Sequence, residues 1–152
     1  MASRFIRRVV LLLLAGCGGS GLGGGSSQPL GSSPSDCVDH INSLRATRGL
    51  PALARWGDAE SCANDQARSD SESGDPHGAF RACDEHAQNE CPGWRSLSSI
   101  VPGCLDMMWA EGPGSGDAHG HYNNMVSTSY TRVACGFYTS PGGDVWAVQD
   151  FQ

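Results

Sequence analysis

Apolar residues follow two different periodicities along this chain, one early and one late. Val38, Ile41 and Leu44 recur at a spacing of three, which is typical of one face of a helix. Residues 132–139 and 144–151 are instead rich in alternating Val, Phe, Tyr and Trp, and a Ser-Pro-Gly-Gly turn joins them. The pattern predicts helices first and an antiparallel hairpin last, so the fold class is α+β and not a parallel sheet.

The helix boundaries follow from capping and stop residues. Ser35 and Asp36 are expected to cap the first helix, and Gly49 with Pro51 is expected to end it. No clear pattern assigns residues 78–93 to helix or strand. The remaining helices are expected over residues 58–73, 101–110 and 121–126.

The first sixteen residues have the pattern of a bacterial lipoprotein signal peptide. Three arginines precede the apolar run 9–14, which is too short to span a bilayer but suits a secretory signal. The run leads into Leu14-Ala15-Gly16-Cys17, which resembles a lipobox. The resemblance implies that residues 1–16 are removed and that Cys17 is lipidated. Gly18, in place of Asp, points to an outer-membrane lipoprotein facing the periplasm or the cell exterior. An ordinary signal peptide is the alternative.

A tether is expected to follow the lipidated cysteine. Gly and Ser fill thirteen of the eighteen positions from 18 to 35. Such a composition buries too little apolar surface to fold. Residues 17–35 are therefore interpreted as the lipidated Cys17 and its linker, and residues 36–152 as one folded domain.

The charge balance narrows the partners. The chain has ten arginines, no lysine and sixteen acidic residues. Arg4, Arg7 and Arg8 lie in the leader, so the mature protein is more acidic still. Without a basic patch, nucleic acid is excluded as a partner, and contact with a membrane is expected through the lipid anchor alone.

Six cysteines remain once Cys17 is set aside. An even number in an exported chain predicts three disulfides, although fifteen pairings are possible. A cysteine zinc site is the alternative, but the sequence has no C-x-x-C pair. The six are Cys37, Cys62, Cys83, Cys91, Cys104 and Cys135.

An ordered set of motifs spans residues 37–151. Its main members are Asn42-Ser43-Leu44-Arg45-Ala46, Gly120-His121-Tyr122-Asn123-Asn124-Met125 and Arg132-Val133-Ala134-Cys135-Gly136-Phe137. In this order they resemble the CAP (SCP) superfamily of cysteine-rich secretory, antigen 5 and pathogenesis-related proteins. The resemblance implies a single α-β-α sandwich with a small antiparallel sheet that ends in the C-terminal hairpin.

Members of this superfamily often place two His and two Glu around a central cavity. Carried over, these are His77, Glu90, Glu111 and His121. His121 is the best match, whereas Glu90 departs from the superfamily's Gly-Glu-Asn segment because Cys91 follows it. Imidazoles with carboxylates suit zinc or another divalent cation. The alternative is that these residues are surface or structural groups.

Three functions are compatible with these features. The first is a binding module whose cavity holds a divalent metal and a lipid or small apolar ligand. The second is a metal-dependent hydrolase of ester or peptide bonds, with Glu90 or Glu111 as base. The third is a structural protein of the cell envelope with a vestigial site. Binding is favoured, because the sequence has neither an H-E-x-x-H motif nor a G-x-S-x-G elbow.

Overall fold

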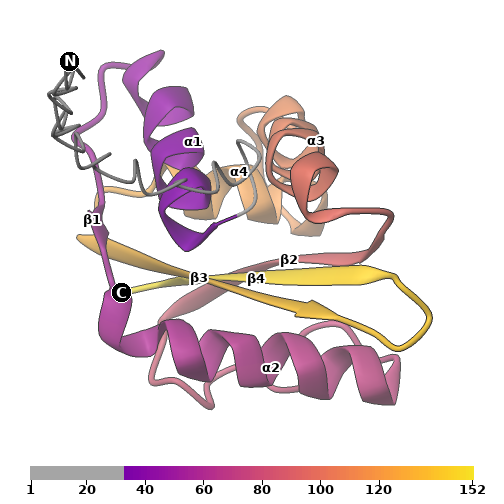
Figure 1. Ribbon diagram of the computed structural model, residues 1–152. Coiled ribbons are helices and arrows are strands. Elements are labelled where there is room, and N and C mark those ends of the chain that lie inside the picture. The colour runs from indigo at the N-terminus through magenta and orange to yellow at the C-terminus, as the bar shows by residue number, and fades with distance from the viewer. Residues whose placement is uncertain (1–32) are drawn as a thin grey trace, which may run out of the picture.

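A four-stranded sheet lies between two layers of helices in the computed structural model, which describes residues 33–152 (Figure 1). This arrangement confirms the α+β sandwich. The leader, Cys17 and the linker up to residue 32 lie outside the described residues. The elements are α1 (Pro34–Ala46), β1 (Ala54–Arg55), η1 (Gly57–Ala59), α2 (Glu60–Ser73), β2 (Ala87–Trp94), α3 (Leu97–Ala110), η2 (Asp117–His119), α4 (Gly120–Val126), β3 (Arg132–Thr139) and β4 (Val145–Phe151).

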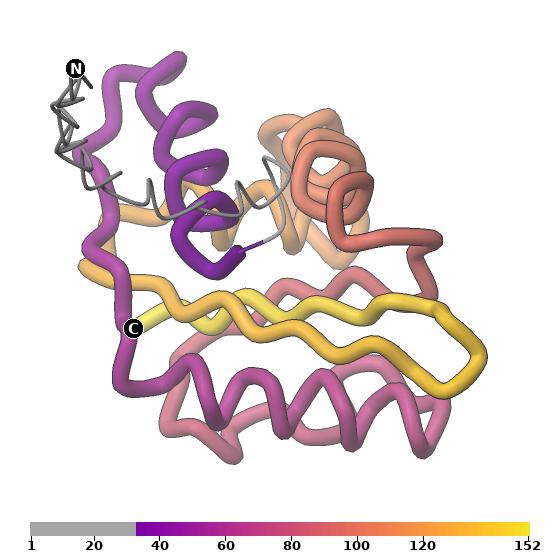
Figure 2. Tube along the Cα trace, viewed as in Figure 1, coloured from indigo at the N-terminus to yellow at the C-terminus, as the bar shows by residue number. Residues whose placement is uncertain are grey.

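Helix α2 covers one face of the sheet, and α1, α3 and α4 cover the other (Figure 2). The strand order is β1-β3-β4-β2. The predicted hairpin of β3 and β4 is confirmed, and β2 pairs antiparallel with β4. In the part of the chain described, no helix is long and apolar enough to cross a membrane.

The resemblance implies an antiparallel sheet, but one pair of its strands is parallel. The two residues of β1 pair in parallel with the start of β3. The Asn42 side chain fixes this segment, because its Nδ2 donates to the Leu53 carbonyl at 2.9 Å and its Oδ1 accepts from the Leu53 N–H at 2.8 Å. The chain leaving α1 therefore reaches the edge of β3 in an extended form.

Two helices begin earlier than the sequence pattern predicts. The cap of α1 is Ser33, whose hydroxyl accepts the Asp36 N–H at 3.2 Å while the Asp36 carboxylate accepts the Ser33 N–H at 3.2 Å. Pro34 fits the first helical position because its missing N–H has no helical partner there. Pro34 and Ser35 therefore belong to the domain and not to the linker. Helix α3 begins at Leu97 and not at residue 101, capped by Ser96.

Strand β2 lies in the segment that the sequence left unassigned. Its register against β4 shifts between Cys91 and Trp94, around Pro92 and Gly93. Gly93 has a φ of +67°, a conformation that glycine adopts without strain. Proline and glycine are tolerated here because β2 is an edge strand, and they hide the strand pattern in the sequence.

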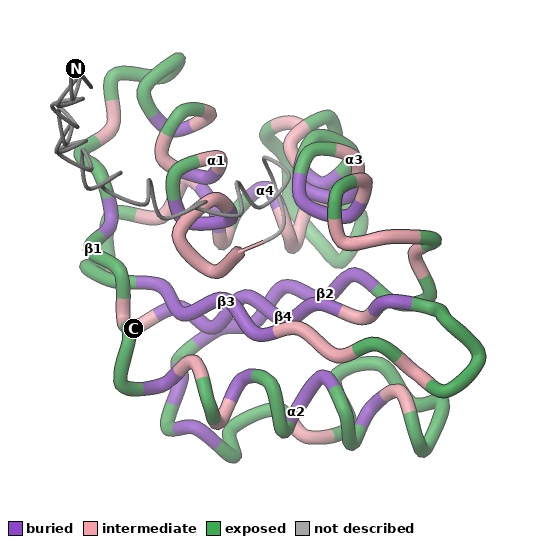
Figure 3. Tube along the Cα trace, viewed as in Figure 1, coloured by how far each residue is buried: buried purple, intermediate pink, exposed green. Residues whose placement is uncertain are grey.

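The strands of the sheet are largely buried (Figure 3), and the side chains that pack against its two faces differ in size. The face under α1, α3 and α4 buries large side chains, among them Ile41, Ile100 and Phe151, each 0% exposed. The face under α2 is packed with alanines and Val148. Gly136 permits this close approach, because a Cβ there would lie 2.1 Å from the Ala63 carbonyl carbon.

The three predicted disulfides are present, and the structure selects one of the fifteen pairings. Cys37–Cys135 joins α1 to β3, Cys62–Cys83 joins α2 to the segment that follows it, and Cys91–Cys104 joins β2 to α3. Each bridge thus ties a helix to the sheet or to a neighbouring loop.

Candidate functional site

His77 and His121 meet at the sheet edge formed by β2. Their ring centroids are 6.2 Å apart and the ring planes differ by 24°. His77 lies in the turn after α2 with a φ of +62°, and His121 lies in the first turn of α4. A non-glycine residue with positive φ is held there by its surroundings. The structure therefore brings together the two histidines that the superfamily resemblance singled out.

Glu111 fixes the His121 ring. Its Oε1 lies 2.6 Å from His121 Nδ1, and its Oε2 accepts the Tyr122 N–H at 3.1 Å. Glu111 directly follows α3, so this pair also joins α3 to α4. Because both carboxylate oxygens are engaged, Glu111 orients the ring from behind and holds the start of α4.

Glu90 bonds to the backbone of His77 and is buried away from solvent. Its Oε2 accepts the His77 N–H and lies 3.8 Å from His77 Nδ1. The Glu90 side chain is 0% exposed, and no described residue bonds to its Oε1. Burial raises the pKa of this carboxyl to about 7. The contact explains how a histidine is kept at positive φ.

Gln88 is the site residue that the sequence did not reveal. Its Oε1 lies 2.9 Å from His77 Nδ1, closer than Glu90 Oε2 at 3.8 Å. Gln88 and Glu90 point to the same face of β2 because side chains alternate along a strand. Had the sequence predicted β2, this alternation would have placed the two residues together. Pro92 and Gly93 interrupt the strand pattern, so β2 was not predicted.

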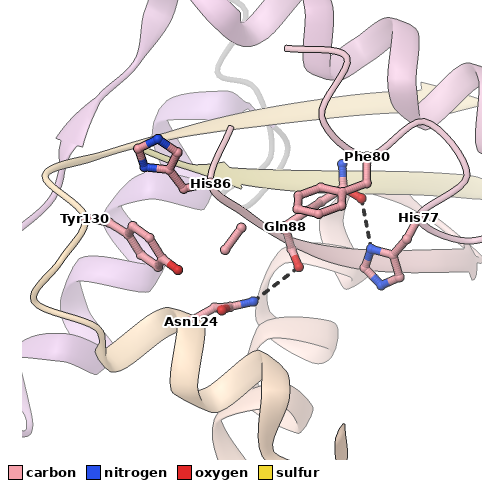
Figure 4. Close-up of a pocket in the computed structure, with 7 residues that line it drawn as sticks. His77, Phe80, His86, Gln88, Asn124 and Tyr130 are labelled. Carbon is pink, nitrogen blue, oxygen red and sulfur yellow. Dashed lines mark hydrogen bonds between the residues drawn. The ribbon is translucent and has the colours of Figure 1, made fainter. Parts of the chain in front are cut away.

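A pocket of about 420 Å³ opens beside His77 (Figure 4). Phe80 and Tyr130 provide aromatic walls, while Asn124 provides an amide at its base. Asn124 is held by bonds from its Nδ2 to the Gln88 carbonyl and to Asn89 Oδ1, at 3.3 and 2.9 Å. His86, Ala87 and Gln88 complete the lining.

The donor set fits a divalent cation through the two imidazoles. Nδ1 of each ring faces an acceptor, so Nε2 is the atom that would bind a metal, and neutral imidazole suits zinc. The four predicted residues form two His–acid pairs and not one compact group. Among the described residues, three candidate ligand atoms lie within 4.8 Å of one another only at Cys83, Glu85 and Asp150, where Cys83 is oxidised.

Comparisons with known proteins agree with this architecture. The family model described as CAP, the cysteine-rich secretory protein family, matches residues 38–151. The crystal structure of MpPR-1i soaked with selenourea is similar, with a TM-score of 0.59, 19% identity, and coverage of 78% of this chain and 88% of that chain. Venom allergen-like protein 4 of Schistosoma mansoni has a TM-score of 0.50 and 14% identity, over 78% of this chain and 86% of that chain. No curated protein matches the sequence.

Proposed function

Since the chain belongs to the cysteine-rich secretory protein (CAP) family, we propose that it is a binding module that works outside the cytoplasm. Family membership and three disulfides indicate an extracellular or secreted protein. The observation that carries the proposal is the histidine pair, because the two partly exposed imidazoles have fixed orientations and one of them, His77, lines a pocket. The side chains of His77 and His121 are 41% and 33% exposed.

His77 and His121 would hold a divalent cation, with zinc as the first choice. The cation would provide a Lewis acid to which an oxygen or nitrogen of a ligand could bind. Glu111 would keep the His121 ring oriented, a role that carboxylates often play behind a metal-bound histidine. Glu90 would act through the backbone of His77 and not as a ligand, since its side chain is fully buried.

The pocket would receive the ligand itself. Its volume of about 420 Å³ lies within the usual range of small-molecule sites, roughly 300–1,000 Å³. Phe80, which is 38% exposed, and Tyr130 give it apolar walls, so a small apolar molecule or part of a lipid chain is the ligand class it suits. The imidazole of His86 and the amide of Asn124 would bond to a polar group on that ligand.

Binding is favoured over metal-dependent hydrolysis by the state of the two acids. A general base must reach a water in the pocket. Glu111 already accepts two hydrogen bonds, and Glu90 lies within the protein with 0% of its side chain exposed. Neither carboxylate lines the pocket, so neither is placed to activate a water there. Hydrolysis that disappears in Glu111→Gln would reverse this preference.

We further propose that the domain is anchored to the outer membrane by a lipid on Cys17. The proposal is supported by the lipobox-like Leu14-Ala15-Gly16-Cys17 and the Gly/Ser-rich linker after it. Fractionation of cells expressing the full chain and its Cys17→Ser variant tests this. Release of the variant alone supports the anchor, whereas equal behaviour of both contradicts it.

Metal content measured by inductively coupled plasma mass spectrometry tests the binding site. The oxidatively folded protein should carry close to one divalent ion after incubation with zinc and dialysis. His77→Ala/His121→Ala should lose it. His40→Ala is the matched control, because His40 bonds to Asp106 between α1 and α3, away from the pocket. An absence of metal in the wild type, or its retention in the double variant, would exclude the proposed site.

A further inference from the structure

A hydrogen-bonded chain of buried side chains lies behind His77. Gln88 reaches from β2 with its Oε1 at His77 Nδ1, and its Nε2 donates to Gln66 Oε1 at 3.2 Å and to Asp150 Oδ1 at 3.1 Å. Gln66, Gln88 and Asp150 are 2%, 6% and 0% exposed. Figure 4 shows the outer end of this chain, where Gln88 meets the histidine.

The direction of these bonds is set at the inner end. Gln66 Nε2 donates to the Ala79 carbonyl at 3.0 Å and to Glu85 Oε1 at 2.7 Å, and a backbone carbonyl can only accept. Glu85 is committed as an acceptor, because it also receives the backbone N–H groups of Arg81 and Cys83. The Gln66 amide must therefore turn its oxygen towards Gln88.

The orientation of the Gln88 amide is fixed by its partners in the same way. Its amide nitrogen lies between two acceptors, Gln66 Oε1 and Asp150 Oδ1. Rotating the amide by 180° would place its oxygen against Gln66 Oε1, which cannot donate to it, and would lose a buried hydrogen bond that is costly to leave unmade. The Gln88 oxygen is thus presented to His77, and an amide oxygen accepts but never donates.

We propose that Gln88, held by Gln66 and Asp150, is a positioning residue that fixes neutral His77 as its Nδ1–H tautomer. Nδ1 then carries the hydrogen, and Nε2 keeps its lone pair for a ligand. Glu111 imposes the same arrangement on His121 through a carboxylate. The two rings therefore both present Nε2 as an acceptor, and the pair selects cations and hydrogen-bond donors over anions.

The inference deepens the proposed binding role of His77 and rests on it for the choice of ligand. The tautomer of His77, however, can be observed in the metal-free protein. The two ideas can therefore be tested separately, one by spectroscopy without metal and the other by titration with zinc.

Nuclear magnetic resonance of the ¹⁵N-labelled, metal-free protein tests the tautomer. Long-range ¹H–¹⁵N spectra recorded with the rings neutral should show a protonated Nδ1 and an unprotonated Nε2 for His77. Free imidazole side chains favour the opposite tautomer, so the signature is specific. A wild-type His77 with its hydrogen on Nε2 would overturn the proposal without any variant.

Gln88→Met and its control Gln149→Met complete the test. Gln88→Met removes the acceptor at similar volume, so His77 should shift towards the Nε2–H form and zinc affinity should fall about 10- to 100-fold. Gln149 is also a buried amide, 1% exposed, and it contacts Cys91 Sγ on the opposite face of the sheet. Gln149→Met should leave the His77 tautomer unchanged, and a matching change in this control would overturn the assignment to Gln88.

The outcomes separate the two proposals. A wild-type Nδ1–H tautomer with no zinc binding supports the role of Gln88 and overturns the proposed cation. Zinc binding with an unchanged tautomer in Gln88→Met supports the cation and overturns the role of Gln88. Should Gln88→Met fail to fold, Gln66→Met interrupts the same chain one residue further from His77 and should give a mixture of tautomers.

Discussion

The two faces of the sheet differ in what their buried groups do. The face under α1, α3 and α4 buries large apolar side chains and is crossed by two disulfides. The face under α2 combines small alanines with a buried polar chain of Gln66, Gln88 and Asp150. Apolar burial stabilises without specifying direction, whereas a satisfied polar chain fixes the orientation of each member. One face of the sheet thus mainly stabilises the fold, and the other mainly orients the side chains behind His77.

Each face also contains an instructive exception. On the apolar side Arg45 is 1% exposed, and its guanidinium donates to the carbonyls of Pro51, Met125 and Ser127 at 3.0, 2.6 and 2.9 Å. On the polar side Asp150 has an oxygen, Oδ2, with no partner among the described residues. Arg45 is stabilised by three hydrogen bonds to backbone carbonyls, whereas burial raises the pKa of Asp150 to about 7 and so favours its neutral form.

The largest expected effect comes from opening the apolar face. Replacing Cys37 and Cys135 by alanine removes a bridge between positions 98 apart in sequence, and should lower the free energy of unfolding by about 2–5 kcal/mol. Denaturant titration measures this. The same change at Cys62 and Cys83, which lie 21 apart, should cost less but should disturb the His77 segment more. Equal losses of stability would contradict the division between the faces.

The pH dependence of stability should arise on the polar face. Burial raises the pKa of Asp150 from 3.8 to about 7, so between these values the folded protein binds a proton that the unfolded chain does not. Stability should therefore fall as pH rises from about 4 to about 7. Asp150 contributes up to about 1.4 kcal/mol per pH unit to the slope, and Glu90, whose pKa burial raises from 4.5 to about 7, adds a second contribution. Thermal melts across this range measure it.

Asp150→Asn provides the matched comparison. It should remove the Asp150 contribution and so reduce the slope, because the amide cannot titrate, while its oxygen can still accept from Gln88. Asp144→Asn, at an exposed position of the β3–β4 turn, should leave the slope as in the wild type. Stability that rises with pH over this window, or an unchanged slope in Asp150→Asn, would refute the assignment.

The smallest effect is expected at Gly136, where α2 lies close against the sheet. Gly136→Ala places a methyl group against the Ala63 backbone, so α2 must move outward at a cost of about 1–3 kcal/mol. The movement should be visible as amide shift changes along α2 but not α1. Gly142→Ala is the control, since its Cβ would meet nothing nearer than Ser140 Oγ at 3.6 Å. Similar losses in both variants would disprove the close approach.

The sequence predicted elements whose pattern is complete within themselves. The hairpin followed from alternation along β3 and β4, and α4 followed from a short run that begins at His121. Strand β2 was missed because Pro92 and Gly93 interrupt it, and the cap of α1 was missed because Ser33 lies in a Gly/Ser-rich stretch. The bounds of such elements are set by contacts with the rest of the fold and not by their own sequence pattern.

The candidate site was predicted only in part for the same reason. Resemblance to the family placed His77 and His121 together, and the structure shows their rings 6.2 Å apart. Gln88 could not be found without β2, since its role depends on facing His77, Gln66 and Asp150 at once. The disulfide pairing likewise depends on which elements meet across the sheet, which the cysteine spacing does not contain.

The outer margin of β2 bears on whether copies of this protein can pair through their sheets. An edge strand normally offers free N–H and C=O groups to a strand of another molecule. Here Asn124 occupies the Gln88 carbonyl at 3.3 Å, Pro92 has no N–H to give, and Gly93 shifts the register. These three features interrupt the row of backbone groups that would template a second chain, so copies of the protein held close together should resist strand-to-strand self-association.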